Sequence, residues 1–279
     1  MNKLIKKPFY FFLLFISLMS NAQVRPKLAE IFKEKEGNVY KIYARNTNFC
    51  PISVFFTYTA TNTCGFPSER VLVEAQAQKQ YLFTIKACNT KDAYNFNYRY
   101  TYWLGDTDLK STDKDFVYML PFSEGSSYKV MQGYNGSYSH QNENSIDFKT
   151  PEGSKVVAMR EGVVIAVKED SNKGGPNSSY ANDGNYILIH HSDNTFGLYY
   201  HFKQNGCVVN EGDAIKQGQL IGYSGNTGWS SEPHLHVNIC SYKPQVNDKN
   251  MITYETFFAT KGNKKTFLQK DKTYTSVMP

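Results

Sequence analysis

The chain has 279 residues, which is long enough for one large domain or two medium ones. Aromatic residues make up 15% of it, with 21 Tyr and 19 Phe, and this favours a core built from strands because aromatic side chains suit pleated, half-buried surfaces. The formal net charge of +6 falls to about +3 once the basic leader described below is removed, which is too weak to indicate a nucleic-acid partner.

Residues 1–22 are typical of a secretory signal peptide. Lys3, Lys6 and Lys7 precede an apolar run over 9–16, and Ser20-Asn21-Ala22 supplies the small residues of a cleavage site. The apolar run is shorter than the roughly 20 residues that a membrane-spanning helix needs. We therefore expect an exported protein, periplasmic or extracellular, with no integral membrane segment in the mature chain.

The next part of the chain, 23–125, is predicted to be an accessory β-sandwich with its linker. Residues 24–36 are charged and are interpreted as a short helix or a disordered lead-in. Short runs of β-forming residues follow, separated by Asn, Thr, Gly and Pro, which is typical of an antiparallel, immunoglobulin-like sandwich. These runs cover 39–44, 52–58, 70–73, 80–85 and 94–103. The segment contains no histidine, so we expect it to be noncatalytic, with 105–125 as the connection.

A second all-β domain, antiparallel and richer in glycine, is predicted over 126–245. Strands are expected at 155–159, 162–167, 186–189 and 196–200. The polar loop 170–184 is long for a compact domain, and we expect it to form one wall of a cleft. Residues 246–279 are interpreted as a strand over 253–258 and a peripheral tail.

Export makes disulfides possible among the five cysteines. Cys50, Cys64 and Cys88 lie in the first half of the chain, and Cys207 and Cys240 lie in the second. One bridge in each half is a reasonable expectation, and the odd number leaves at least one cysteine outside any internal bridge.

All six histidines lie between residues 140 and 236, as expected for a metal site built from imidazoles. His234 and His236 alternate with Leu235 and Val237, so on a strand the two imidazoles share one face while the apolar residues face the core. His201 is expected at the end of a strand, pointing opposite to Tyr200 and Phe202. His190 and His191 precede a Ser-Asp-Asn turn and are interpreted as turn or surface residues outside the site.

Three blocks in order resemble the LytM/lysostaphin-type zinc metallopeptidases, peptidase family M23. They are His140 with Asp147, then Tyr200-His201-Phe202, then Gly225-Asn226-Thr227-Gly228 followed by Pro233-His234-Leu235-His236. The resemblance covers roughly 126–245 and implies that His140, Asp147 and His236 hold Zn²⁺ while His201 and His234 are the catalytic pair. The family commonly spaces its first two ligands as H-x-x-x-D, whereas here six residues separate His140 from Asp147, and Glu143 is a lower-ranked alternative ligand.

The resemblance implies a secreted zinc endopeptidase that hydrolyses peptide cross-links of bacterial peptidoglycan. Three protein ligands leave one tetrahedral position on zinc for water, which suits peptide hydrolysis. His234 is then the expected general base and His201 the group that stabilises the oxyanion, although the two roles could be exchanged.

Two other functions fit parts of the sequence. One is a noncatalytic wall-binding protein or an activator of other wall hydrolases, in which the fold is kept without turnover. The other is a biotinyl- or lipoyl-carrier barrel, which export and the absence of a lysine in the Gly225–Gly228 turn both disfavour. Nothing in the sequence sets an oligomeric state.

Overall fold

The computed structural model describes residues 29–108, 113–244 and 250–279, and the signal peptide predicted over 1–22 lies outside them. The described chain is nearly all β, with one short 3-10 helix, η1, at Ser178–Asp183. None of the helical structure in these ranges is long and apolar enough to cross a membrane.

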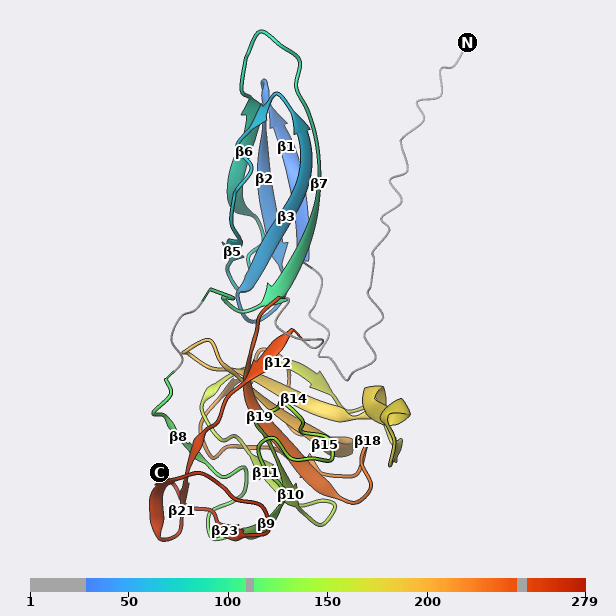
Figure 1. The fold of residues 1–279 in the computed structure, drawn as a ribbon, viewed down its shortest axis with the longest axis vertical. Helices are drawn as coiled ribbons and strands as arrows, with labels where there is room; N and C mark the ends of the chain where they lie inside the picture. The colour runs from blue at the N-terminus through green and yellow to red at the C-terminus, as the bar shows by residue number, and fades with distance from the viewer. Residues whose placement is uncertain (1–28, 109–112, 245–249) are drawn as a thin grey trace.

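Two sheets make up the amino-terminal domain, the upper part of Figure 1. One has the order β1-β2-β6-β4, and the other has the order β5-β3-β7. Their strands are β1 (Ala29–Glu36), β2 (Val39–Asn46), β3 (Ile52–Thr61), β4 (Thr63–Cys64), β5 (Val71–Val73), β6 (Gln80–Ala87) and β7 (Asn95–Leu104). The five runs predicted in this domain all coincide with strands, and every pairing is antiparallel.

Strand β1 corrects the expectation of a helix or disordered lead-in over 24–36 for its described part, 29–36. Glu36 pairs with Val39 across the two-residue turn Gly37-Asn38, and Gly37 adopts a φ of +59°. A two-residue turn that begins with glycine is a strong hairpin signal, and it outweighs the charged composition of the strand. Ala29 and Ile31 of β1 are buried, so the hairpin also contributes to the core.

The carboxy-terminal domain is built on a large sheet of order β16-β12-β14-β15-β19-β10-β9-β23 (lower part of Figure 1). Strands β11 (Lys155–Val157), β17 (Leu220–Ser224) and β20 (Met251–Thr253) pair at its sides. The main strands are β9 (Ser127–Gln132), β10 (Ser145–Lys149), β12 (Gly162–Lys168), β14 (Asn185–His190), β15 (Phe196–Cys207), β16 (Ala214–Ile215), β19 (His234–Tyr242) and β23 (Thr273–Thr275). This matches the antiparallel sheet that the sequence predicts for the domain.

Segments on both sides of 126–245 pack into the same core as this sheet. Strand β8 (Val117–Met119) pairs in parallel with β21 (Phe257–Thr260), which also pairs with β22 (Asn263–Thr266). Phe122 and Phe258 are both fully buried in one cluster with the sheet's apolar face. The strand predicted over 253–258 is interrupted, since β20 ends at Thr253 and β21 begins at Phe257.

A second apolar cluster joins the two domains. It contains Ile52 and Val54 from the first domain together with Phe196, Cys240 and Tyr242 from the second. The accessory domain therefore covers one end of the sheet face that carries the histidines on β19.

One disulfide among the described residues, Cys64–Cys88, connects the last residue of β4 to the residue that follows β6. Cys50, Cys207 and Cys240 are free thiols in the structure. The expected second bridge, between Cys207 and Cys240, is therefore wrong. Cys240 is fully buried in the interdomain cluster, whereas Cys207 lies at the end of β15.

Candidate metal centre

The three predicted metal ligands lie on two neighbouring strands and one loop. Asp147 on β10 lies directly opposite His236 on β19, and His236 lies opposite Tyr200 on β15. His140 lies in the loop 133–144 that connects β9 to β10, and its backbone N–H donates to Gly136 O. The sheet register thus sets the position of two ligands, and the loop brings in the third.

The three side chains point their ligand atoms at one another. His140 Nε2 lies 3.2 Å from His236 Nδ1 and 3.2 Å from Asp147 Oδ1, and His236 Nδ1 lies 2.9 Å from Asp147 Oδ1. Ligands about 2.0–2.1 Å from a tetrahedral Zn²⁺ are separated by about 3.3 Å, so this triangle is close to the size that zinc requires. Two imidazoles and one carboxylate are also the donors of catalytic zinc sites, and the residues present therefore fit the ion.

Charge at this triangle favours a cation. Burial would raise the pKa of Asp147, but hydrogen bonds from His140 and His236 hold it well below its usual range. Burial lowers the pKa of His236, whereas at His140 the opposing hydrogen bond and charge of Asp147 prevail and raise the pKa. The carboxylate is therefore ionised at neutral pH and attracts positive charge to the point where the two imidazoles meet.

The Gly133 carbonyl oxygen fixes the orientation of His140. His140 Nδ1 lies 3.1 Å from Gly133 O and donates its hydrogen to that carbonyl, so Nε2 is the ring nitrogen that faces the other two ligands. Glu143, the alternative ligand considered from the sequence, is outside the group of ligand atoms that converge here. The six-residue spacing between His140 and Asp147 is accommodated by the turns of the loop.

His234 lies beside this triangle with one ring nitrogen anchored. Its Nδ1 donates to Glu232 O at 2.8 Å and lies 3.1 Å from Ser230 Oγ. Its Nε2 lies 3.9 Å from Asp147 Oδ1, on the same face of β19 as His236. Leu235 and Val237 are buried in the core on the opposite face, which confirms the predicted alternation.

His201 reaches the site through an unusual backbone conformation. Its φ is +72°, in the left-handed region that non-glycine residues rarely adopt. Tyr199 and Phe202 both face the core, while the ring of His201 contacts the rings of Tyr200 and His234, at centroid distances of 4.8 and 4.2 Å. The prediction that His201 opposes Tyr200 is wrong, since the positive φ interrupts the alternation and puts both side chains on the site face.

The Gly-Asn-Thr-Gly turn explains how His201 is held. His201 Nδ1 donates to Thr227 O at 2.6 Å, and burial, followed by the neighbouring His234 and His236, lowers the pKa of His201 well below its ordinary value. Gly228 adopts a φ of +81°, and a Cβ there would lie 2.6 Å from Gly184 Cα. The turn can approach the η1 segment this closely only with glycine at that position.

Gln132 is a site residue that the sequence reasoning missed. It lies on β9, where its Nε2 donates to Asp147 Oδ2 at 3.0 Å. Its Oε1 accepts from the backbone N–H groups of Tyr138 and Ser139, so one side chain ties the carboxylate to the loop that carries His140. Gln132 could have been found as an inward-facing polar residue opposite Asp147, but only once the pairing of β9 with β10 is known.

The two histidines kept out of the site remain apart from it. His190 Nε2 contacts Asn194 Oδ1 at 3.1 Å, and His191 Nδ1 contacts Thr195 Oγ1 at 2.9 Å. His191 begins the turn after β14, as expected, but it is fully buried and therefore not a surface residue. Neither belongs to the group of converging ligand atoms.

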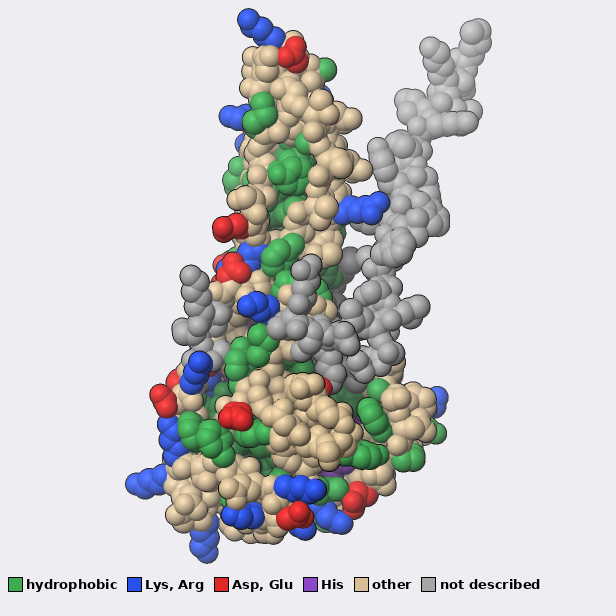
Figure 2. Space-filling model, in the orientation of Figure 1, with side chains coloured by type: hydrophobic (Ala, Val, Ile, Leu, Met, Phe, Trp, Pro, Cys, Tyr) green, Lys and Arg blue, Asp and Glu red, His purple; other side chains and the backbone are tan. Residues whose placement is uncertain are grey.

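Two loops approach each other beside the five residues. Tyr138, from the loop of His140, is 60% exposed, and its hydroxyl lies 3.4 Å from Pro176 O in the segment 170–184. That segment contains β13 (Gly174–Gly175), which pairs in parallel with β18 (Gly228–Trp229). The histidines themselves are largely enclosed, and only small areas of histidine colour are visible in Figure 2.

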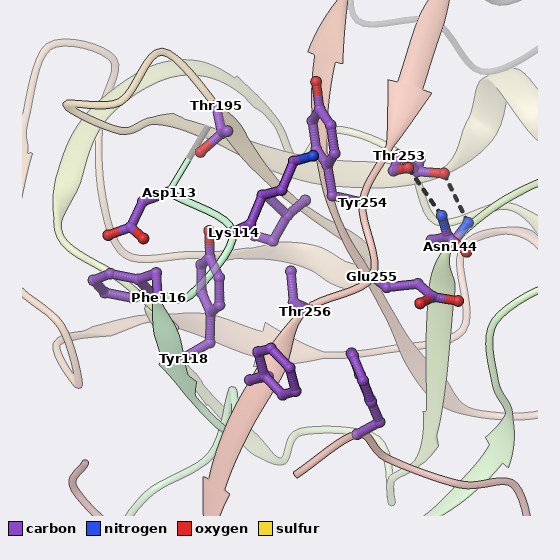
Figure 3. Close-up of a pocket in the computed structure, with 13 residues that line it drawn as sticks. Asp113, Lys114, Phe116, Tyr118, Asn144, Thr195, Thr253, Tyr254, Glu255 and Thr256 are labelled. Carbon is purple, nitrogen blue, oxygen red and sulfur yellow. Dashed lines mark hydrogen bonds between the residues drawn. The ribbon is translucent and has the colours of Figure 1, made fainter. Parts of the chain in front are cut away.

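A separate pocket of about 430 Å³ lies against the opposite, core-facing side of β19. Figure 3 shows that it is lined by the connector residues Asp113, Lys114 and Phe116 and by the segment from Thr253 to Thr256, with Asn144 bonded to Thr253. It shares no residue with the five-residue site, and its mixed charges suit no single ligand class.

Known proteins match the part of the chain that contains this site. The model of "Peptidase family M23" matches residues 141–248. Peptidoglycan DD-endopeptidase ShyA of Vibrio cholerae is 35% identical over 37% of this chain and 21% of its own length. Lysostaphin of Staphylococcus staphylolyticus is 36% identical over 33% of this chain and 17% of its own length. The crystallised catalytic domain of lysostaphin from Staphylococcus simulans is 24% identical, over 46% of this chain and 87% of that one, with a TM-score of 0.33.

These matches cover only about a fifth of the length of the curated relatives. The family match begins one residue after His140, and the geometry places that histidine with Asp147 and His236 all the same. The family match, the identities to M23 relatives and the His-Asp-His group together show that this part of the chain, residues 141–248, is similar to the LytM/lysostaphin-like peptidases of family M23.

Proposed function

We propose that this chain is a secreted zinc metalloendopeptidase that hydrolyses peptide cross-links of bacterial peptidoglycan. The observation that carries the proposal is the convergence of His140 Nε2, Asp147 Oδ1 and His236 Nδ1 to within 3.2 Å of one another, with two further histidines beside them. A metal-free binding protein has no need for five convergent side chains of this kind, four buried and His236 partly buried, because each is costly to bury without a partner.

In this proposal His140, Asp147 and His236 hold Zn²⁺, and His201 and His234 act on the substrate. When bound, zinc supplies Lewis acidity, which lowers the pKa of water and polarises a carbonyl group. His201 and His234 both donate their Nδ1–H to backbone carbonyls, so Nε2 of each ring is left as an acceptor. His234 Nε2, which is nearer to the ligand atoms, takes the proton of the attacking water. His201 Nε2 is an acceptor of the same kind, so the two histidines could exchange the role of base, and His201 donates to the developing oxyanion only in its imidazolium form.

The substrate class rests on the relatives. One is named a peptidoglycan DD-endopeptidase, and another is named a glycyl-glycine endopeptidase, ALE-1 of Staphylococcus capitis. Both names describe endopeptidases, but the names give different peptide bonds as the ones cleaved. We therefore propose a peptide cross-link of peptidoglycan as the substrate. Assays on direct cross-links and on glycine bridges decide which of the two is cleaved.

Further parts of the proposal concern the rest of the chain. We propose that 1–22 is a signal peptide, that the protein acts in the periplasm or outside the cell, and that the two amino-terminal sheets are an immunoglobulin-like accessory domain. The domain limits expected from the sequence, 23–125, 126–245 and 246–279, are kept as proposals. The packing of β8, β21 and β23 with the large sheet favours different limits for the second domain, in which residues from about 113 onward form one folding unit.

The test is release of new amino groups from purified peptidoglycan, with one substrate carrying direct cross-links and one carrying glycine bridges. We expect release that a chelator abolishes, about one zinc per chain, and loss of that zinc in His236→Ala. His201→Ala and His234→Ala should each retain zinc and lose at least about 100-fold in rate, the contribution of a positioned proton-transfer group. Absence of chelator-sensitive release at every pH from about 6 to 8, with binding to peptidoglycan retained, would instead establish the noncatalytic alternative.

A further inference from the structure

Asn238 lies directly behind the ligand His236 and has no role in the function proposed above. The two residues are two positions apart on β19, so their side chains share the site face. Asn238 is 4% exposed, and its Nδ2 lies 3.4 Å from His236 Nε2 and 3.2 Å from Ser145 Oγ on β10. Its carbonyl oxygen, Oδ1, is buried without a hydrogen-bond partner among the described residues.

The hydrogen on the His236 ring has to be on a different nitrogen in the two states of the site. Without a cation, His236 Nδ1 contacts Asp147 Oδ1 at 2.9 Å and donates its hydrogen to that carboxylate. Nε2 is then an acceptor, and the Asn238 NH₂ group facing it is the correct partner. When Nδ1 uses its lone pair to hold a cation, the hydrogen is on Nε2, which then needs an acceptor.

An amide can satisfy both arrangements because it carries a donor and an acceptor on one planar group. Rotation by half a turn about the Cβ–Cγ bond exchanges Nδ2 and Oδ1. After this rotation Oδ1 can accept from His236 Nε2–H and from the Ser145 hydroxyl. The carbonyl oxygen thereby gains two donors, while the NH₂ group takes the buried position that Oδ1 occupies in the metal-free site.

We propose that Asn238 is a positioning residue that selects the tautomer of His236, presenting its NH₂ group to Nε2 in the metal-free site and its carbonyl oxygen to Nε2–H in the zinc-bound site. This inference rests on the metal site proposed above. The competing explanation is structural, in which Asn238 only connects β19 to β10 through Ser145.

Three variants separate these explanations. Asn238→Leu has a similar volume and offers neither donor nor acceptor to His236. Asn238→Asp offers only acceptors, which are what the zinc-bound state requires. Ser145→Ala removes the connection between the strands and leaves the amide against His236, so it is the matched control.

The measurement is the zinc dissociation constant by chelator competition at one pH, with melting temperatures of the metal-free proteins to verify folding. We expect Asn238→Leu to bind zinc 10–100-fold more weakly, the usual effect of losing a partner of a metal-bound histidine. Asn238→Asp should bind within a few-fold of the wild type or more tightly, and Ser145→Ala should be nearly unchanged. In ¹⁵N-labelled protein, two-bond ¹H–¹⁵N correlations should place the hydrogen of His236 on Nδ1 without zinc and on Nε2 with zinc.

Several results would overturn the inference. Wild-type zinc affinity in folded Asn238→Leu, or more than tenfold weaker binding in folded Asn238→Asp, contradicts a role as acceptor. An equal loss of affinity in Ser145→Ala and Asn238→Leu supports the structural explanation instead. If His236→Ala binds zinc like the wild type, the metal site itself is wrong, which is a different failure from that of Asn238.

Discussion

At the scale of single residues, both carboxylate oxygens of Asp147 contact other side chains of the site. Oδ1 faces the imidazoles of His140 and His236, while Oδ2 accepts from Gln132. A carboxylate held on both sides cannot rotate away from its ligand position. Gln132 therefore contributes to the metal site through Asp147, and through its bonds to the backbone of the His140 loop.

Substituting Gln132 should weaken metal binding in a graded way. Gln132→Leu removes the hydrogen bond to Asp147, and we expect zinc affinity to fall 10–100-fold by chelator competition. Gln132→Glu keeps the acceptor for the loop but places a second carboxylate against Asp147 Oδ2, so the metal-free protein should also melt at a lower temperature. Gln217→Leu, which removes a bond to Met159 O elsewhere in the domain, is the control. Wild-type zinc affinity in Gln132→Leu would show that Asp147 needs no such support.

The ligands could be predicted from the sequence, but their supporting residues could not. His140, Asp147, His201, His234 and His236 belong to motifs whose residue types and order are visible in the chain. Gln132 and Asn238 are ordinary amides, and their relevance comes from the register of β9 and β19 with β10. That register is a product of the folded sheet, because it depends on how distant segments pair.

At the scale of elements, strand alternation correctly predicts which way the side chains of β19 point, but it fails for His201 on β15. His234, Leu235, His236 and Val237 alternate as expected. In β15 the left-handed conformation of His201 interrupts the alternation, and the pairing with β17 shifts register between Phe202 and Cys207. A strained backbone at a functional residue persists only where its surroundings hold it, and here the Thr227 carbonyl and the surrounding rings do so.

Thr227 joins the elements that hold this conformation, and its hydroxyl can be tested separately from its carbonyl. The hydroxyl donates to Phe202 O at 2.7 Å and accepts from Asn185 N at 3.0 Å. Thr227→Val keeps the shape but leaves both buried backbone groups without this partner, and we expect a loss of about 1–3 kcal/mol of unfolding free energy in urea. Thr227→Ser keeps the hydroxyl and should lose only about 1 kcal/mol for the missing methyl group. A valine variant as stable as the serine variant would contradict this account.

At the scale of the whole molecule, the two domains are one packed unit. Asn194, at the turn after β14, donates to Asp106 O at 2.9 Å and accepts from Asp106 N at 3.1 Å through its side-chain amide. A Cβ at Gly212 would lie 2.7 Å from the Phe49 ring of the accessory domain. With the shared cluster around Phe196 and Cys240, these contacts leave the accessory domain a fixed neighbour of the site face. The sequence predicted two domains, but it contained no pattern that indicated how their surfaces fit.

Stability of the whole chain should depend on pH through His191, which is buried near this turn. Burial, followed by the charge of Arg160, lowers the pKa of His191 to about 3, and its Nε2 has no hydrogen-bond partner within the described chain. Because the folded-state pKa lies below the ordinary value of about 6.5, the unfolded chain binds a proton that the folded chain does not. This contribution to stability is complete above about pH 6.5 and is lost as the pH falls towards 3, with about 2 kcal/mol lost between pH 6.5 and 4.5. His191→Asn retains a donor for Thr195 Oγ1 and cannot titrate, so its unfolding free energy should change by about 2 kcal/mol less than that of the wild type over this range. Equal pH dependence of the two proteins in urea unfolding would show that His191 is not the group responsible.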